Sequence, residues 1–387
     1  MSSETVFRLG LLRLTDAAPL IVGRELGYFA AENIEVSLSV EPSWANIADK
    51  LSWGLLDGAM MLPPLALALR LGLSGSGGPE AIIVPAALSL NGNTVTLATR
   101  WAELALGTDG AGATPEAARR FAAAIREQGE KPVLGVVHTF STHNLLLRYW
   151  LATGGLDPEQ DVSFMVVPPA ETADALASGR IDGFCAGAPW GEVAARARTG
   201  RTVASSHAIW NHGTENVLAV RQRIADDDPE RLQAVLRAVL RAAAYCDRPG
   251  DAPSVAAILA QKHYLSIPAE IILTSLPGAA SRGRSDADIS IFFANAANIP
   301  WRSHAQWFLG QMQRWGYVAK NTKLDTAAAI FRPELYAQAA SSLGLPVPAA
   351  FVKSEGHHSS DWLLPASPAP ISMGGDSFID GAVFDPL

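Results

Sequence analysis

Two predicted helix starts carry aromatic N–H donors that suit the binding of a small anion. Ser43 stands just before Trp44, and Ser141 and Thr142 stand just before His143, so each donor follows a residue that caps helices. The first turn of a helix has free backbone N–H groups and the positive end of the helix dipole, and both attract anions. If the two helices face each other across a cleft, Trp44 and His143 bind one anion between them. Taken singly, the tryptophan is more often a packing residue and the histidine an ordinary, exposed polar residue of a first turn.

Two further segments add candidate members of this site. Asn93 ends the run Leu-Asn-Gly-Asn at residues 90–93, where its amide can bind an anion, although Asn-Gly-Asn is more often only a turn. Gly187 and Trp190 lie at the end of a predicted strand, in the run Gly-Ala-Pro-Trp. The indole of Trp190 either lines the same cleft or packs inside a lobe.

The sequence contains no complete catalytic or metal-binding motif. The G-x-S-x-G, Walker A, G-x-G-x-x-G and H-E-x-x-H patterns are absent, and the glycine-rich residues 72–78 predict a plain turn. Cys185 and Cys246 are too few for a disulfide framework and lack metal-ligand spacing. His357 and His358 have no partners at such spacing, which predicts a solvated loop. We therefore expect no enzymatic activity, no cofactor and no metal.

The elements that must position these residues alternate between strands and helices. This alternation is typical of α/β lobes with mostly parallel sheets; it runs through the first hundred residues and restarts after a glycine-rich loop at 107–114. After a strand at 214–221 the chain is mainly helical, and residues 354–377 predict an irregular tail. The strands are expected at 6–14, 34–40, 57–62, 93–99, 132–137, 162–167, 181–187 and 214–221, and the helices at 19–31, 43–53, 115–128, 142–152, 171–178, 229–245, 254–264, 268–276 and 301–315.

A repeated pattern supports two similarly built lobes. Residues 51–58 (LSWGLLDG) and 176–183 (LASGRIDG) share the pattern L-x-x-G-x-[LI]-D-G, which predicts a helix end, a glycine turn and an Asp-Gly entry into a strand. We place one lobe at residues 1–98 together with 218–387, which include a helical extension and the tail. The second lobe is placed at residues 99–217.

Length and charge narrow the class of protein. The 387 residues are 49% hydrophobic and 18% charged, which is typical of a globular chain of two or three folding units. The net charge of −8 argues against direct binding of nucleic acid, which needs concentrated positive charge. The start of the chain lacks the features of an export signal, and no apolar run reaches the ~20 residues of a membrane span. We therefore expect a cytoplasmic protein without membrane insertion.

The sequence resembles the nitrate/bicarbonate-binding protein family in segments that follow one another from about residue 6 to residue 386. The segments include both helix starts, the Asn-Gly-Asn turn and both copies of the Asp-Gly strand entry. They are residues 14–20 (LTDAAPL), 27–29 (GYF), 43–51 (SWANIADKL), 56–63 (LDGAMMLP), 90–93 (LNGN), 142–150 (THNLLLRYW), 182–185 (DGFC), 189–190 (PW) and 380–386 (DGAVFDP).

The resemblance implies an α/β fold and an oxyanion site. The fold is a two-lobed, type II periplasmic binding-protein-like C-clamp, with a mixed, mostly parallel sheet and flanking helices in each lobe. The family's site includes a tryptophan, an amide side chain and a histidine, which the resemblance places at Trp44, Asn93 and His143. Exported members deliver nitrate to a membrane transporter, whereas members without an export signal resemble the nitrate/nitrite sensor NasS.

The missing export signal favours the sensor among these roles. The resemblance then implies a cytosolic protein that closes on nitrate or nitrite and thereby releases an RNA-binding antiterminator of the NasT type, which regulates nitrate assimilation. The alternative within the same fold is the substrate-binding component of a nitrate/bicarbonate ABC transporter.

Two positions depart from the family pattern. Asn216 stands where a lysine is expected, which removes a positive charge from the site, and Ala188 stands where a glutamate is expected, which removes a negative one. The first departure leaves the preference among nitrate, nitrite and bicarbonate open. The second argues against a bicarbonate site that uses a metal.

An alternative from another class is an enzyme on the same two-lobed scaffold, for instance one that acts on a small precursor in thiamin-pyrimidine synthesis. Cys185 is then the natural nucleophile and His143 the natural base. The sequence offers no third group to orient them, so the catalytic set is incomplete.

Overall fold

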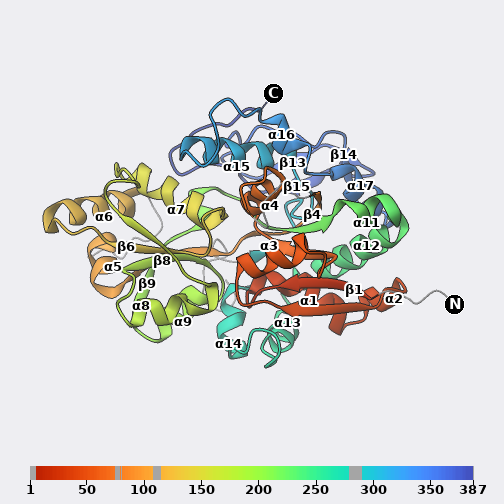
Figure 1. The fold of residues 1–387 in the computed structure, drawn as a ribbon, viewed down its shortest axis with the longest axis horizontal. Coiled ribbons are helices and arrows are strands. Elements are labelled where there is room, and N and C mark those ends of the chain that lie inside the picture. The colour runs from red at the N-terminus through yellow and green to blue at the C-terminus, as the bar shows by residue number, and fades with distance from the viewer. Residues whose placement is uncertain (1–5, 75–78, 80, 108–114, 279–289, 387) are drawn as a thin grey trace.

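The computed structural model describes residues 6–386 apart from 75–78, 80, 108–114 and 279–289. The chain forms two lobes that lie side by side, each built on one twisted sheet with helices on its faces (Figure 1). No helix in the described ranges combines the length and the apolar character that a membrane span requires. The glycine-rich stretches at 75–78 and 108–114, which we predicted as a turn and a loop, fall outside the described residues.

Lobe I is built on a six-stranded sheet in the order β11-β4-β10-β3-β1-β2. The strands β1 and β2 and the strands β1 and β3 pair in parallel, whereas β10 pairs antiparallel with both β3 and β4, and β11 pairs antiparallel with β4. The strands are β1 (Phe7–Leu11), β2 (Val36–Val40), β3 (Gly58–Met61), β4 (Ile82–Asn91), β10 (Thr214–Arg221) and β11 (Ser290–Ile291).

Lobe II is built on a five-stranded sheet in the order β7-β6-β8-β5-β9. Here β6 pairs in parallel with β7 and β8, and β5 pairs antiparallel with β8 and β9. The strands are β5 (Asn93–Ala98), β6 (Val133–Val136), β7 (Ser163–Val166), β8 (Gly183–Gly187) and β9 (Gly200–Ser205). The predicted two-lobed α/β architecture is confirmed, and both sheets are mixed because the strands that enter from the other lobe run against the parallel ones.

The chain crosses between the two sheets twice. The first crossing is at Gly92, since β4 belongs to the sheet of lobe I and β5 to the sheet of lobe II. The second crossing is the segment 206–213 between β9 and β10. Asn91 and Gly92 have φ angles of 58° and 88°, so the first crossing is a tight turn that needs left-handed backbone. The sheets therefore change over before the predicted lobe boundaries at 98/99 and 217/218.

The repeated Asp-Gly pattern plays the same part in both lobes. In lobe I the backbone N–H of Arg8 donates to the carboxylate of Asp57 at 3.0 Å, while the N–H of Asp57 donates to the Arg8 carbonyl at 2.9 Å. In lobe II, Val133 and Asp182 make the same exchange at 2.9 and 2.7 Å. The glycine three residues before each aspartate has a φ of +73°. Each aspartate thus ties its glycine turn to the parallel strand beside it.

Most predicted elements are present, with small shifts at their ends. The helices expected at 43–53, 115–128, 142–152, 229–245 and 301–315 are observed. The helix expected at 19–31 is two helices, because Gly27 has a φ of +76° and breaks the helical backbone. The main helices are α1 (Ala18–Glu25), α2 (Tyr28–Ala31), α3 (Trp44–Ser52), α4 (Pro63–Arg70), α5 (Thr99–Leu106), α6 (Pro115–Gln128), α7 (Thr142–Thr153), α8 (Thr172–Ala177), α9 (Trp190–Arg196), α10 (Ser206–Ile209), α11 (Gln222–Asp227), α12 (Pro229–Cys246), α13 (Ala252–Leu259), α14 (Ala269–Ile272), α15 (Arg302–Arg314), α16 (Asp325–Ala328) and α17 (Pro333–Ser342).

The C-terminal tail is irregular, as predicted, and it packs on both lobes. It contains the short strands β13 (Trp362–Leu364), β14 (Ala366–Ser367) and β15 (Ile371–Met373), with β14 paired to β12 (Val347–Pro348). The predicted loop at His357 and His358 is present, but the second ring is only partly exposed: His358 stacks on Trp362 at 3.9 Å, and its Nδ1 lies 3.1 Å from Asp376. Further along, Phe378 stacks on Tyr149 of α7.

Candidate functional site

Five buried polar side chains meet where the two lobes join, and we call them the inter-lobe polar cluster. They come from four elements: the short helix η1 (Thr15–Ala17), β5, the first turn of α7, and the start of β10. None is more than 1% exposed. The members are Asp16, Asn93, His143, Glu215 and Asn216.

The cluster is held together by contacts between residues that are far apart in the sequence. The amide Nδ2 of Asn93 donates to Glu215 Oε2, and the amide Nδ2 of Asn216 donates to Asp16 Oδ2 at 2.8 Å. The hydroxyl of Ser290 donates to the other oxygen of Asp16 at 3.0 Å. Because α7 and β5 belong to lobe II, and η1 and β10 to lobe I, both lobes contribute residues to the cluster.

Several atoms of the cluster have no hydrogen-bond partner among the described residues. They are both ring nitrogens of His143 together with Asn93 Oδ1, Glu215 Oε1 and Asn216 Oδ1. Two of these atoms, His143 Nε2 and Glu215 Oε1, lie 3.4 Å apart. Buried polar groups are nearly always paired, so these donors and acceptors give the cluster the capacity to bind a small polar ligand.

Burial sets the protonation of the cluster. It lowers the pKa of His143 to about 3 and raises the pKa of Asp16 to about 7, where the hydrogen bonds from Ser290 and Asn216 oppose the effect. Burial and the nearby Asp16 charge also raise the pKa of Glu215 well above its ordinary value. Near neutral pH the imidazole is therefore neutral, and the cluster favours protonated carboxyl groups.

Two glycines let the backbone approach these side chains closely. A Cβ atom on Gly187, the last residue of β8, would lie 3.3 Å from Asp16 Oδ2 and 3.4 Å from Asn93 Oδ1. A Cβ on Gly92 would lie 3.2 Å from Asp16 Oδ1 and only 2.4 Å from the hydroxyl of Ser290. Any larger residue at either position would therefore crowd the cluster.

The structure brings four of the six predicted site residues together. Asn93, His143 and Asn216 belong to the cluster, and Gly187 lies against it. His143 is fully buried, which corrects the expectation of an exposed first-turn residue: the packing of α7 against the lobe junction covers it. Ser141 caps α7 as predicted, since its hydroxyl accepts the N–H of Asn144 at 3.0 Å.

The indole N–H groups of the two predicted tryptophans differ in their hydrogen bonds. The indole N–H of Trp190, the first residue of α9, donates to the carbonyl of Arg13 at 3.0 Å and so links lobe II to lobe I. Trp44 begins α3 after the predicted Ser43 cap; it is fully buried, and its Nε1 has no partner among the described residues. No hydrogen bond joins either indole to the cluster, and their role in binding stays a prediction.

Sequence reasoning missed the two carboxylates, Asp16 and Glu215. Asp16 lies just after the first strand, and Glu215 stands beside Asn216, which drew attention as the position of an expected lysine. A carboxylate at a strand end beside a site predicted for an anion is the signal that could have singled them out. Lysine and arginine are absent from the described contacts of both groups.

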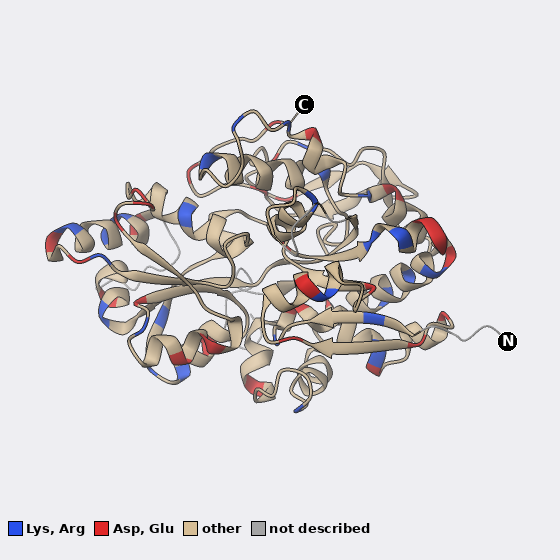
Figure 2. Ribbon diagram, viewed as in Figure 1, with Lys and Arg blue, Asp and Glu red and all other residues tan. Residues whose placement is uncertain are grey.

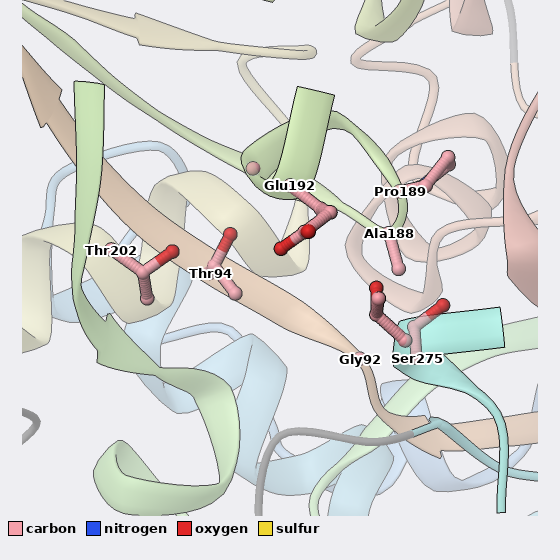
Figure 3. Close-up of a pocket in the computed structure, with 9 residues that line it drawn as sticks. Gly92, Thr94, Ala188, Pro189, Glu192, Thr202 and Ser275 are labelled. Carbon is pink, nitrogen blue, oxygen red and sulfur yellow. The ribbon is translucent and has the colours of Figure 1, made fainter. Parts of the chain in front are cut away.

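A pocket opens beside the cluster, between lobe II and the turn η3 (Leu273–Ser275) of lobe I (Figure 3). Gly92 lies on its wall and also faces Asp16, so one residue separates the pocket from the cluster. The hydroxyl of Ser275 lies 3.2 Å from the hydroxyl of Thr15, the residue before Asp16. The pocket is lined by Gly92, Thr94, Ala188, Pro189, Gly191, Glu192, Thr202, Thr274 and Ser275.

The geometry disfavours the Cys185 enzyme. Cys185 is 1% exposed, and burial together with the charge of Glu215 raises the pKa of its thiol well above the ordinary value, which disfavours the reactive thiolate. In the described part of the chain, no three His, Cys, Asp or Glu side chains gather into a metal-binding group. Lysine and arginine residues are interspersed with aspartate and glutamate residues along the ribbon of both lobes (Figure 2).

Comparison with known proteins identifies the family. The sequence profile of the NMT1-like family matches residues 2–260, about two thirds of the chain. The chain belongs to the NMT1-like family. It is 30% identical to the nitrate/nitrite binding protein NrtA of Synechocystis sp. over 399 aligned positions, which cover 99% of this chain and 82% of that protein.

Other relatives of this NMT1-like protein include a longer one. The nitrate import ATP-binding protein NrtC of Synechocystis sp. is 37% identical over 347 positions, which cover 87% of this chain and 50% of NrtC, so the chain spans only half of that relative. The bicarbonate-binding protein CmpA of Synechococcus sp. is 29% identical over 98% of this chain and 84% of CmpA.

The architecture agrees with a solved member. The crystal structure of the periplasmic nitrate-binding protein NrtA from Synechocystis matches with a TM-score of 0.85 and 27% identity, covering 99% of this chain and 96% of that chain. The NMT1-like chain therefore has the type II periplasmic binding-protein fold that the resemblance implied.

Proposed function

We propose that this protein binds a small oxyanion, with nitrate or nitrite as the first candidates, as the substrate-binding component of an ABC-type import system. The observation that carries the proposal is the inter-lobe polar cluster, in which His143 is fully buried and neither ring nitrogen has a hydrogen-bond partner among the described residues. A buried donor without a partner at a lobe junction is suited to a ligand that enters when the lobes separate. The names of NrtA, NrtC and CmpA favour nitrate, nitrite or bicarbonate as that ligand.

The import role has better support than the sensor role. The sensor that controls a NasT-type antiterminator followed from the resemblance and from the apparent lack of an export signal. The relatives described above are binding proteins and an import component, and none of their names refers to regulation. Because this chain has no Walker A motif, we propose no ATP binding for it in spite of its likeness to NrtC.

Isothermal titration calorimetry of the purified protein tests the ligand. Nitrate, nitrite, bicarbonate and sulfate are titrated separately, and we expect a saturable heat for at least one of the first three. Sulfate serves as the control, because its extra charge and tetrahedral form do not suit a buried site without a cation. The proposal fails if neither a nitrogen oxyanion nor bicarbonate binds.

A variant at His143 tests whether the cluster is the site. We expect His143→Ala to weaken binding of that anion by about 1.5–3 kcal/mol, the usual worth of a hydrogen bond to a charged group. Since His143 is fully buried, its removal also leaves a cavity, so His143→Asn is the matched variant that keeps a polar donor. An unchanged dissociation constant in a folded His143→Ala protein would place the anion elsewhere.

The partner is tested by affinity capture from the native cell, with and without nitrate. Recovery of a membrane permease supports the import role. Recovery of an RNA-binding protein that leaves when nitrate is added would support the sensor role and a cytoplasmic location instead. Fractionation of the same cells tests that location directly.

A further inference from the structure

The inter-lobe polar cluster has the wrong charge for a site that binds an anion unaided. Two carboxyl groups, Asp16 and Glu215, are buried in it, and no lysine or arginine contacts them among the described residues. Burial keeps His143 neutral near pH 7. A buried anion next to an ionised carboxylate is strongly disfavoured, because the repulsion is poorly screened and neither charge is hydrated.

The hydrogen bonds indicate which carboxyl oxygen can carry a proton and so remove the repulsion between the carboxylate and the anion. Both oxygens of Asp16 are occupied, by Asn216 and Ser290. In Glu215 only one oxygen is paired: Oε2 accepts a hydrogen bond from Asn93, and Oε1 has no hydrogen-bond partner among the described residues. This oxygen lies 3.4 Å from His143 Nε2, the predicted anion donor, so a proton on Oε1 would place a second donor beside the imidazole.

We infer that the site takes up its oxyanion together with one proton. Glu215 keeps this proton on Oε1 and donates a hydrogen bond to the anion. This inference rests on the proposed function and adds the protonation state of the ligand complex. A protonated carboxyl is an O–H donor, so it turns the repulsive group into a hydrogen-bond partner for the anion. Asn93 positions Glu215 by holding the other oxygen.

None of the titratable groups around Glu215 stabilises its ionised form near neutral pH. Asp16 faces it from η1 and raises its proton affinity, while His143 faces it from α7 and is neutral through burial. Cys185 lies nearby on β8, and burial with the Glu215 charge keeps its thiol protonated. None of these neighbours supplies a positive charge near neutral pH, so above the pKa of Glu215 the proton must come from solution when the anion enters.

Proton uptake has a measurable consequence for affinity. By linkage, the dissociation constant for the anion rises with pH above the pKa of the coupled group, and the slope approaches tenfold per pH unit for one proton. The heat of binding then also depends on the ionisation enthalpy of the buffer, and the slope of that dependence gives the number of protons taken up.

The experiment is calorimetric titration of nitrate or nitrite, whichever binds in the preceding test, between about pH 6 and about pH 9, in two buffers with different ionisation enthalpies at each pH. For the wild-type protein we expect weaker binding at higher pH and uptake of close to one proton in the upper part of the range. For Glu215→Gln we expect a dissociation constant that is nearly independent of pH and no proton uptake, because the amide donates without titrating. Near pH 9 this variant should bind more tightly than the wild type.

The controls separate Glu215 from its neighbours. Glu103→Gln, an exposed substitution on α5, should leave the proton count and the pH profile of the wild type unchanged. Asp16→Asn should keep the uptake but move it to lower pH, since the charge that raises the proton affinity of Glu215 is gone. The number of protons that the wild-type protein takes up tests the inference even if a variant fails to fold.

The outcomes also distinguish this inference from the proposed function. Anion binding with a constant dissociation constant and no buffer dependence overturns the proton uptake and leaves the binding function standing. Uptake that persists in folded Glu215→Gln overturns the assignment to Glu215. Absence of anion binding at every pH overturns the proposed function and this inference with it.

Discussion

At the scale of single residues, Asp16 is a buried carboxyl group whose pKa is raised although both of its oxygens accept hydrogen bonds. It is fully buried just after the first strand, and Ser290 and Asn216 donate hydrogen bonds to its two oxygens at 3.0 and 2.8 Å. Burial raises its pKa to about 7, although both hydrogen bonds favour the charged form. The fold therefore favours the protonated carboxyl, unlike the unfolded chain, in which an aspartate ionises near pH 3.9.

This difference predicts that the contribution of Asp16 to the free energy of unfolding falls as pH rises from about 4 to about 7. In that window the unfolded chain has released the Asp16 proton and the folded protein still holds it, so raising the pH favours unfolding, by up to about 1.4 kcal/mol per pH unit for this group. Asp16→Asn removes this contribution, so its stability relative to the wild type should rise with pH across this window, whereas the exposed Asp174→Asn on α8 should run parallel to the wild type. Urea unfolding of the three proteins at several pH values measures it. Parallel profiles for the wild type and Asp16→Asn would contradict the prediction.

At the scale of elements, α7 connects the cluster to the C-terminal part of the chain. Its first turn carries His143, and one residue later the amide of Asn144 donates to the hydroxyl of Tyr317, beyond α15, at 2.8 Å. Further along, the hydroxyl of Tyr149 donates to the carboxylate of Asp380 at 2.8 Å, and its ring stacks on Phe378 at 5.9 Å. In this way the tail holds a helix of lobe II against lobe I.

We predict that Tyr149→Phe loosens this attachment without disturbing the core, because it removes only the hydroxyl. The loss of one hydrogen bond to a charged partner should lower the free energy of unfolding by about 1.5–3 kcal/mol and speed amide hydrogen exchange in residues 377–386. Hydrogen exchange read by mass spectrometry measures the second effect. Tyr28→Phe, on α2 of lobe I, is the matched control. Equal exchange in the tail of both variants would mean that stacking on Phe378, and not the hydrogen bond, holds it.

At the scale of the whole molecule, the two lobes are joined by direct hydrogen bonds to backbone carbonyls as well as by the cluster. The N–H of Thr15 donates to the carbonyl of Ala188 at 2.8 Å, and the indole N–H of Trp190 donates to the carbonyl of Arg13 at 3.0 Å. Since the first residue of each pair lies in a different lobe from the second, separation of the lobes would break both bonds. These bonds therefore favour the closed arrangement.

We predict that Trp190→Phe shifts the protein toward open forms. The ring still packs, but the bond to Arg13 is lost, which should cost the closed form about 1 kcal/mol and weaken anion binding roughly fivefold. Calorimetry measures the affinity, and small-angle X-ray scattering of the unliganded protein measures the opening. Trp53→Phe is the control, because Trp53 is 62% exposed in lobe I. If the affinity and the scattering of Trp190→Phe match those of the control, the bond does not contribute to closure.

The sequence by itself determined the local elements and their repetition. Helix α6 and strand β10 have the bounds predicted from hydrophobic spacing, and the shared Asp-Gly pattern marks equivalent turns in both lobes because it meets a local demand for a positive φ and a strand entry. It also indicated Asn93 and His143, since turns and helix starts are visible in the chain, whereas Asn216 was indicated only by the resemblance to the family.

Only the tertiary structure decided what those residues meet. The bonds of the cluster join positions 16 and 216, which are 200 residues apart, and positions 93 and 215, which are 122 apart. The same packing buried His143 and brought in Asp16 and Glu215, two carboxylates that no local pattern marked as part of the site. Local spacing sets backbone conformation and the apolar face of each element, whereas burial, pKa and hydrogen-bond partners depend on how the two lobes come together.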